Sequence, residues 1–227
     1  MYRSRDRLVI FDADGTLIDA FPVIGQAFAL NDMDIGDLER FQRRKKLLKY
    51  VGGLREFPKN LRRQIGKEKR KFLKQTLTDL YRTEANLFPG VAAMLERLMA
   101  TSDIRVGIVS RNVTIEPEIS VGAVLERHGI ATERLDFLCC IPLGESKAAT
   151  FDNLRQRFGI NPLKSIVCGD EYKDYAAARS AGMNSLIVSY GFESHTRLID
   201  DYDVPPGLVA QTPEEMITRL FHALDLP

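Results

Sequence analysis

Two carboxylates lie two residues apart near the start of the chain, in the segment Asp12-Ala-Asp14-Gly15-Thr16-Leu17. The segment directly follows a short apolar run, and Gly15 permits a tight turn at this point. A carboxylate can attack phosphorus as a nucleophile, while a second carboxylate transfers the protons of the leaving group and of water. We therefore expect Asp12 to carry covalent chemistry and Asp14 to act as its acid and base.

A second acidic pair, Asp170 and Asp174, follows an apolar run much later in the chain. Carboxylate oxygens are the ligands that Mg²⁺ prefers, and the ion can bridge them to a phosphate group. The pair therefore predicts a magnesium site. The alternative is structural, with Asp170 as a helix cap and Asp174 as an exposed helix residue.

Ser110 ends another apolar run, and Lys147 begins a helical pattern. A lysine side chain can neutralise the oxygens of a phosphoryl group during its transfer, and a serine hydroxyl can donate a hydrogen bond to one of them. We predict these two roles here. The alternatives are an ordinary surface lysine and a serine that caps a helix.

Apolar runs rich in β-forming residues alternate with helical patterns over most of the chain, which predicts an α/β fold with a parallel sheet covered on both faces. Three runs end at Asp12, Ser110 and Asp170. Ligands bind beyond the carboxyl ends of the strands in such sheets, so these residues are expected to meet in one crevice. The predicted strands are Arg7–Asp12, Arg105–Ser110, Phe137–Leu143, Ser165–Asp170, Asn184–Tyr190 and, more weakly, Gly207–Thr212, and the helical patterns include Val91–Ala100, Lys147–Phe158 and Tyr172–Ala181.

The interval 19–87 breaks this alternation because it contains no convincing strand. Leu73, Leu77 and Leu80 share one face of a helical pattern, with basic residues around it. Pro89 and Gly90 then mark the return to the alternating region. We predict a catalytic core formed by residues 1–18 and 88–227, and a helical cap domain formed by residues 19–87.

The charge is divided unequally along the chain. Residues 40–82 contain 16 Lys and Arg against three acids, a net charge of +13, whereas the rest of the chain carries −12. A solvated helical face is the default interpretation of such a run. One alternative is electrostatic capture of an anionic substrate. Another is binding of nucleic acid, but the scarcity of aromatic residues in the run disfavours it.

No apolar run approaches the roughly 20 residues that a membrane-spanning helix requires. The first residues, Met1–Arg7, are polar and unlike a signal peptide. We therefore expect a cytoplasmic protein with no membrane partner.

Four segments resemble, in order and spacing, the four motifs of haloacid dehalogenase (HAD) type phosphatases. Phe88-Pro-Gly90 is similar to the segment that opens the core after the helical cap in phosphoglycolate phosphatase-like members. The resemblance covers nearly the whole chain and implies the HAD fold, a Rossmann-like core with an inserted α-helical cap. The four segments are Asp12-Ala-Asp-Gly-Thr-Leu17, Val109-Ser110, Lys147 and Gly169-Asp-Glu-Tyr-Lys-Asp174.

The resemblance also implies a role for each matching residue. Asp12 would be the nucleophile, and Asp14 the general acid and base, with its backbone carbonyl touching Mg²⁺. Asp170 would bind the metal directly, and Asp174 would support a bound water or Lys147. The implied metal site is thus Asp12, Asp14, Asp170 and Asp174, and the implied phosphate-binding residues are Gly15 and Thr16 through their backbone, Ser110 and Lys147.

The chain departs from the family pattern after Ser110, where Arg111 replaces a small residue or Asn and would add a cation to the pocket. Pro117 also interrupts the region in which relatives have a helix. In the predicted cap, Tyr50-Val-Gly-Gly-Leu-Arg55 resembles the loop that touches the distal part of the substrate. Arg55 is therefore expected to meet a second anionic group, and the alternative is an exposed Arg in a plain turn.

The predicted function is Mg²⁺-dependent hydrolysis of a small phosphorylated metabolite through an aspartyl-phosphate on Asp12. One alternative is a phosphomutase, which shares these motifs but returns the phosphoryl group to a sugar. A binding module that uses the basic cap on nucleic acid is another. Dehalogenation is disfavoured because displacement of a halide has no need for Asp14 or for magnesium.

Overall fold

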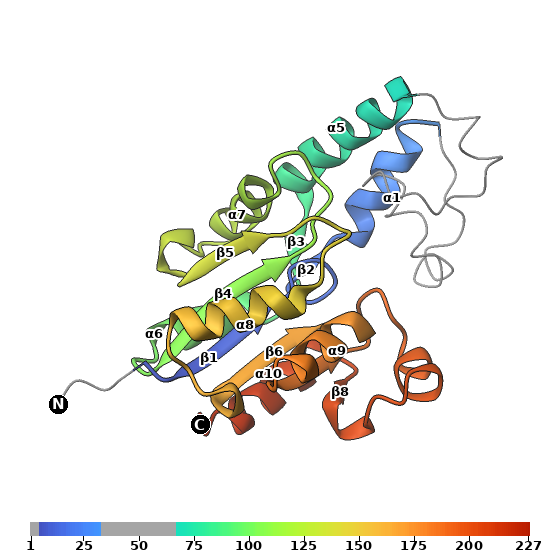
Figure 1. Cartoon of the computed structure of the whole chain (residues 1–227). Helices are drawn as coiled ribbons and strands as arrows, with labels where there is room; N and C mark the ends of the chain where they lie inside the picture. The colour runs from blue at the N-terminus through green and yellow to red at the C-terminus, as the bar shows by residue number, and fades with distance from the viewer. Residues whose placement is uncertain (1–4, 33–66) are drawn as a thin grey trace.

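In the computed structural model, residues 5–32 and 67–227 are described, and they are built around one parallel sheet (Figure 1). Its six strands have the order β5-β4-β1-β6-β7-β8, and every neighbouring pair is parallel. All six predicted strands are confirmed, and the weakest prediction corresponds to the shortest strand. Their bounds are Arg7–Phe11 (β1), Ile104–Ser110 (β4), Phe137–Cys140 (β5), Ser165–Gly169 (β6), Asn184–Val188 (β7) and Val209–Ala210 (β8).

Helices separate these strands along the chain, as the alternating pattern predicted. Side chains cap two of them: Ser146 accepts a hydrogen bond from the Ala148 backbone N–H, and Thr212 accepts one from Glu215. The fold is therefore of the α/β class. The core helices are α6 (Val91–Ala100), α7 (Pro117–Arg127), α8 (Lys147–Arg157), α9 (Tyr172–Ser180) and α10 (Pro213–Ala223).

Both faces of the sheet are buried, and alternate residues of each strand serve opposite faces. In β1, Val9 and Phe11 belong to the large core that includes residues of α6, α7 and α10. Leu8 and Ile10 belong to a second core, where Phe151 of α8 packs with residues of α9. This two-sided burial explains why the strand reads as a continuous apolar run.

Pro117 begins α7 instead of interrupting it, so the sequence interpretation of this region was wrong. A proline at the first helical position loses no hydrogen bond, because the backbone N–H groups of the first turn have no partner within the helix. Glu116 precedes it in a left-handed conformation, with φ of 51°. The chain therefore turns sharply after β4 before the helix starts.

The two ends of the predicted insertion lie side by side. The short strands β2 (Ile18–Asp19) and β3 (Asn86–Leu87) pair antiparallel, with Ile18 opposite Leu87. Two residues per strand are too few to produce a recognisable alternation, which is why the sequence predicted no strand between 19 and 87. The pair coincides with the predicted domain boundary, and the division into two domains stays a prediction.

Two helices, α1 (Phe21–Ala29) and α5 (Lys67–Glu84), project beyond the carboxyl ends of the strands (Figure 1). On α5, Leu73 and Leu77 are buried as predicted, but Leu80 is only partly buried and Tyr81 takes the next buried position. Spacing of four residues keeps these side chains on one helical face. Tyr81 is thereby directed toward the core.

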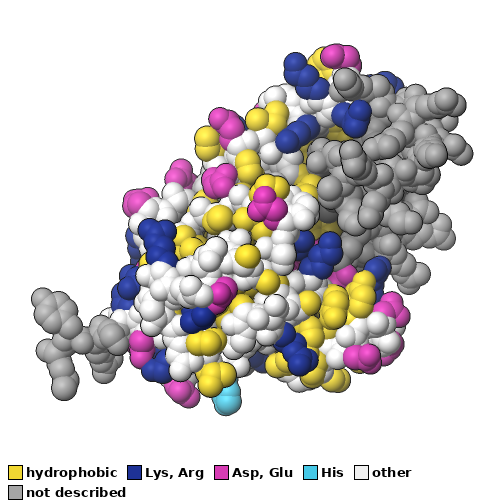
Figure 2. All heavy atoms as spheres, in the orientation of Figure 1, with side chains coloured by type: hydrophobic (Ala, Val, Ile, Leu, Met, Phe, Trp, Pro, Cys, Tyr) yellow, Lys and Arg dark blue, Asp and Glu magenta, His cyan; other side chains and the backbone are white. Residues whose placement is uncertain are grey.

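Only the last part of the basic run, from residue 67 onward, lies within the described residues. Basic side chains gather at the outer end of α5 (Figure 2), where Lys69 and Lys71 are exposed. Arg55 lies outside the described residues. Within the ranges 5–32 and 67–227, no helix has the length and apolar character needed to cross a membrane.

Candidate active site

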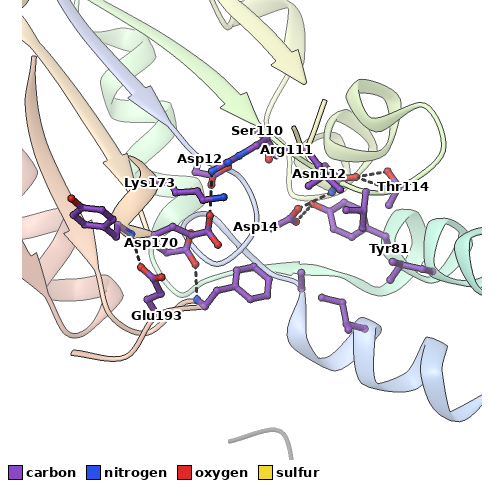
Figure 3. A pocket seen from close by; sticks show the side chains of 18 of the residues that line it. Asp12, Asp14, Tyr81, Ser110, Arg111, Asn112, Thr114, Asp170, Lys173 and Glu193 are labelled. Atoms are coloured by element: carbon purple, nitrogen blue, oxygen red, sulfur yellow. Dashed lines mark hydrogen bonds and ion pairs between the residues drawn. The ribbon is translucent and has the colours of Figure 1, made fainter. Parts of the chain in front are cut away.

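Three neighbouring strands bring the predicted residues together at their carboxyl ends. Asp12 follows β1, Ser110 ends β4 and Asp170 follows β6, and these strands are adjacent in the order β4-β1-β6. All three residues line one cavity of about 370 Å³ (Figure 3). Asp14 lines the same cavity, so the predicted meeting of the strand ends is observed.

Lys147 enters this site from the first turn of α8. Its side chain is only 1% exposed, which excludes the interpretation as a surface lysine. Its Nζ lies 2.7 Å from Oδ2 of Asp12 and 2.8 Å from Oδ1 of Asp174. Burial opposes the charge of Lys147, but these two carboxylates outweigh burial and hold its pKa above the ordinary value. Lys147 therefore keeps its positive charge beside Asp12.

Three carboxylates crowd one point and suit a divalent cation. Asp12, Asp170 and Asp174 each offer one oxygen, and these oxygens lie within 4.8 Å of one another. Asp170 is fully buried; its Oδ2 accepts a hydrogen bond from the Phe192 N–H at 2.5 Å, whereas its Oδ1 has no hydrogen-bond partner among the described residues.

Burial, reinforced by the nearby charges of Glu171, Asp12 and Asp174, raises the pKa of Asp170 well above its usual range. A carboxylate in this position lacks compensation from the protein alone. A cation that takes oxygen ligands would supply it, so the residues present fit a magnesium ion.

Asp14 is held on both oxygens, as Figure 3 shows. The Tyr81 hydroxyl donates to Oδ1 at 2.6 Å, and the Asn112 amide donates to Oδ2 at 2.9 Å. Burial raises the pKa of Asp14 to about 6; the charge of Asp12 also raises it, while the two hydrogen bonds oppose the shift. A carboxyl group that titrates near neutral pH can both give and take a proton.

Gly15 and Thr16 are not among the residues that line the cavity. Gly15 has φ of 79°, and a Cβ placed there would be 2.4 Å from Oδ2 of Asp170. Thr16 is fully buried, and its carbonyl accepts a hydrogen bond from the Tyr190 hydroxyl at 3.0 Å. Gly15 packs against Asp170 and Thr16 is bonded to Tyr190, and their predicted role in phosphate binding stays a prediction.

Arg111 lines the cavity next to Ser110, with 12% of its side chain exposed. Its Nη2 lies 3.2 Å from Oε2 of Glu171 and 3.9 Å from Oδ1 of Asp174. The predicted extra cation is thus present at the cavity wall. Arg111 belongs to the same network of charges as Lys147, because both cations lie near Asp174.

Sequence reasoning missed the two residues that contact Asp14. Asn112 lies two positions after Ser110, in the loop that follows β4, and could have been found there by looking for polar residues beyond the strand end. Tyr81 could have been found from its spacing of four after Leu77 on the buried face of a helix. Nothing in the sequence indicated that this helix face meets Asp14.

The fold and site define an α/β protein with paired acids and a lysine at the carboxyl ends of its strands. The family model of the haloacid dehalogenase-like hydrolases matches residues 7–182. The chain therefore belongs to this family. Its relatives include the phosphoglycolate phosphatase of Synechococcus elongatus, 28% identical over 224 residues that cover 92% of this chain and 94% of that protein. The phosphoglycolate phosphatase of Aliivibrio fischeri is also 28% identical, over a region that covers 86% of this chain and 88% of that protein.

Solved structures share this fold. A predicted phosphoglycolate phosphatase of Haemophilus somnus superposes with a TM-score of 0.72 at 20% identity, covering 96% of this chain and 99% of that one. A structure assigned as a β-phosphoglucomutase of Thermotoga maritima superposes with a TM-score of 0.67 at 18% identity, covering 95% of this chain and 99% of that one. The family match identifies the chain as a hydrolase, and the curated relatives that it resembles are phosphoglycolate phosphatases.

Proposed function

We propose that this protein is a Mg²⁺-dependent phosphatase that hydrolyses a small phosphomonoester through an aspartyl-phosphate on Asp12. The observation that carries the proposal is the ion pair between the buried cation of Lys147 and Asp12, which lines the same cavity as Asp14. This arrangement supplies a nucleophile, a fixed positive charge and an acid at a single point.

In the first step, an oxygen of Asp12 attacks phosphorus, and the bond between phosphorus and the ester oxygen breaks. Asp14, in its acid form, gives its proton to the departing oxygen. Lys147 and Ser110 contact the phosphoryl oxygens and stabilise their charge. The alcohol leaves with the proton of Asp14, and Asp12 carries the phosphoryl group.

In the second step, water attacks the phosphorus of the aspartyl-phosphate, and the bond to the Asp12 oxygen breaks. Asp14, now a carboxylate, takes the proton of that water. Inorganic phosphate leaves and both acids return to their starting states. A pKa of about 6 for Asp14 suits these opposite demands near neutral pH.

Asp12 and Asp170 would hold Mg²⁺ directly, together with the backbone carbonyl of Asp14, while Asp174 would support a metal-bound water or Lys147. The bound ion would neutralise negative charge on the phosphoryl group. Two residues of the chain set the positions of these carboxylates. Lys147 contacts Asp12 directly, and Gly15 packs closely against Asp170.

The proposed substrate is phosphoglycolate, in line with the names of the curated relatives. This molecule is small and carries a carboxylate besides its phosphate. Arg111 at the cavity wall is a candidate partner for that second anion. Arg55 is proposed for the same role from the sequence.

The test is phosphate release from purified protein with Mg²⁺ and a panel of phosphomonoesters that includes phosphoglycolate and sugar phosphates. We expect free phosphate without any bisphosphate activator, and the highest kcat/KM for phosphoglycolate. The similarity to a β-phosphoglucomutase structure motivates the phosphomutase as the second candidate. Conversion between sugar phosphate isomers, without release of phosphate, would favour the mutase.

A further inference from the structure

The carboxyl group of Asp14 is oriented by donors from two different elements. Tyr81 comes from α5, and Asn112 from the loop between β4 and α7. The amide of Asn112 cannot reverse, because its Oδ1 accepts hydrogen bonds from both the backbone N–H and the hydroxyl of Thr114. Its Nδ2 therefore faces Oδ2 of Asp14 in either protonation state.

Tyr81 is held as firmly as Asn112. Its side chain is buried, and α5 is bonded to the same loop on either side of it. The hydroxyl of Thr78 accepts from the Ile115 N–H at 2.9 Å, and Arg82 donates to the Ile115 carbonyl at 2.8 Å. The position of the Tyr81 hydroxyl is thus fixed by the docking of α5 on this loop.

Both oxygens of a carboxyl group keep acceptor capacity whether the group is ionised or protonated. Tyr81 and Asn112 can therefore donate to Asp14 before and after proton transfer, which leaves the acid proton free for the departing ester oxygen. Such a clamp keeps the carboxyl group in one rotamer through both steps of the reaction.

We infer that Tyr81 and Asn112 are positioning residues that aim the proton of Asp14 at the departing ester oxygen. The inference rests on the proposed role of Asp14 as general acid and base. It couples the reaction to α5, so the helix that connects the predicted cap to the core also orients the acid.

The experiment compares an alkyl phosphate, phosphoglycolate, with 2,4-dinitrophenyl phosphate in the full-length protein with Mg²⁺. The dinitrophenolate leaves without a proton, so its kcat/KM does not depend on the aim of Asp14. We expect Tyr81→Phe and Asn112→Ala to lower kcat/KM for the alkyl phosphate roughly tenfold to a hundredfold, since small misplacements cost about this much. The loss should lie in kcat, and the aryl substrate should lose less than about threefold on the same reasoning.

Thr83→Val is the matched control, because it removes a side-chain hydrogen bond within α5 that involves neither Asp14 nor the loop. It should leave the ratio of the two kcat/KM values unchanged. Equal losses on both substrates in Tyr81→Phe and Asn112→Ala, or no loss in either variant, would overturn the inference. If Tyr81→Phe fails to fold, the ratio for Asn112→Ala decides.

Asp14→Asn separates this inference from the proposed function. Undiminished hydrolysis of the alkyl phosphate by Asp14→Asn would refute the role of Asp14 as the general acid, and the inference with it. A selective loss in Asp14→Asn without one in the two positioning variants would refute the inference alone.

Discussion

At the scale of single residues, Asp12 is tied to the site through both carboxylate oxygens. Oδ1 accepts the Ala13 N–H at 2.7 Å, and Oδ2 lies against Lys147. An amide has nearly the same shape but cannot attack phosphorus. The structure therefore allows the nucleophile to be removed while the surrounding contacts stay nearly intact.

We predict that Asp12→Asn abolishes turnover and leaves the melting temperature close to that of the wild type. Lys147 keeps Asp174 as a partner, so no buried charge is left alone. Phosphate release and thermal melting on freshly purified protein check the two parts. Wild-type turnover in this variant would contradict the role of Asp12.

Lys147 is predicted to matter for stability as well as for activity. Lys147→Met leaves Asp12 buried without its cation and leaves Asp174 with Arg111 alone, 3.9 Å away; breaking a buried pair of this kind typically costs about 3–5 kcal/mol. Lys164→Met is the control, because Lys164 pairs with Asp6 at an exposed site, and such pairs contribute about 0–1 kcal/mol. Urea unfolding measures both, and equal free-energy changes would show that Lys147 is not structurally important.

At the scale of elements, the periodicity of the sequence and the ends of its apolar runs were enough to predict the strands and the residues that follow them. Asp12, Ser110 and Asp170 were predictable because each directly follows or ends an apolar run, and parallel strands align their carboxyl ends. Lys147 was predictable as a helix start, but its burial between two acids was not. Contacts made by Tyr81 and Asn112 depend on how α5 packs against the loop after β4, and no local pattern encodes that packing.

The turn after β1 provides a prediction at this scale. Gly15→Ala would place a Cβ 2.4 Å from Oδ2 of Asp170, in addition to the strain of positive φ. Gly129→Ala shares the strain, with φ of 82°, but nothing lies within 4 Å of its Cβ. We expect both variants to lose about 1–2 kcal/mol of stability from the backbone, but only Gly15→Ala to lose activity, measured by phosphate release. Equal activities would show that the turn has room to adjust around Asp170.

At the scale of the whole molecule, the excess of positive charge in residues 40–82 is balanced by an excess of negative charge elsewhere. Part of that negative charge is concentrated where Asp12, Asp170 and Asp174 meet. A protein that buries several acids together loses stability unless a cation compensates them. The global stability of the molecule should therefore depend on the metal.

We predict that Mg²⁺ raises the melting temperature of the wild type and that Asp170→Asn reverses the order of the two proteins. In excess chelator, Asp170→Asn should melt at or above the wild type, because a neutral amide in a fully buried position relieves the cost of the charge while its oxygen can still accept from Phe192.

With Mg²⁺ at 100 times its Kd, the wild type should gain about 2.7 kcal/mol, which raises the melting temperature by several degrees, while the variant gains little. Mg²⁺ should support phosphate release and Ca²⁺ should not, since Ca²⁺ takes more ligands at longer distances and would misplace Asp12. Melting curves of both proteins in chelator, Mg²⁺ and Ca²⁺ test this directly. Identical wild-type curves in chelator and Mg²⁺, with full activity in chelator, would show that the acids are compensated by the protein alone.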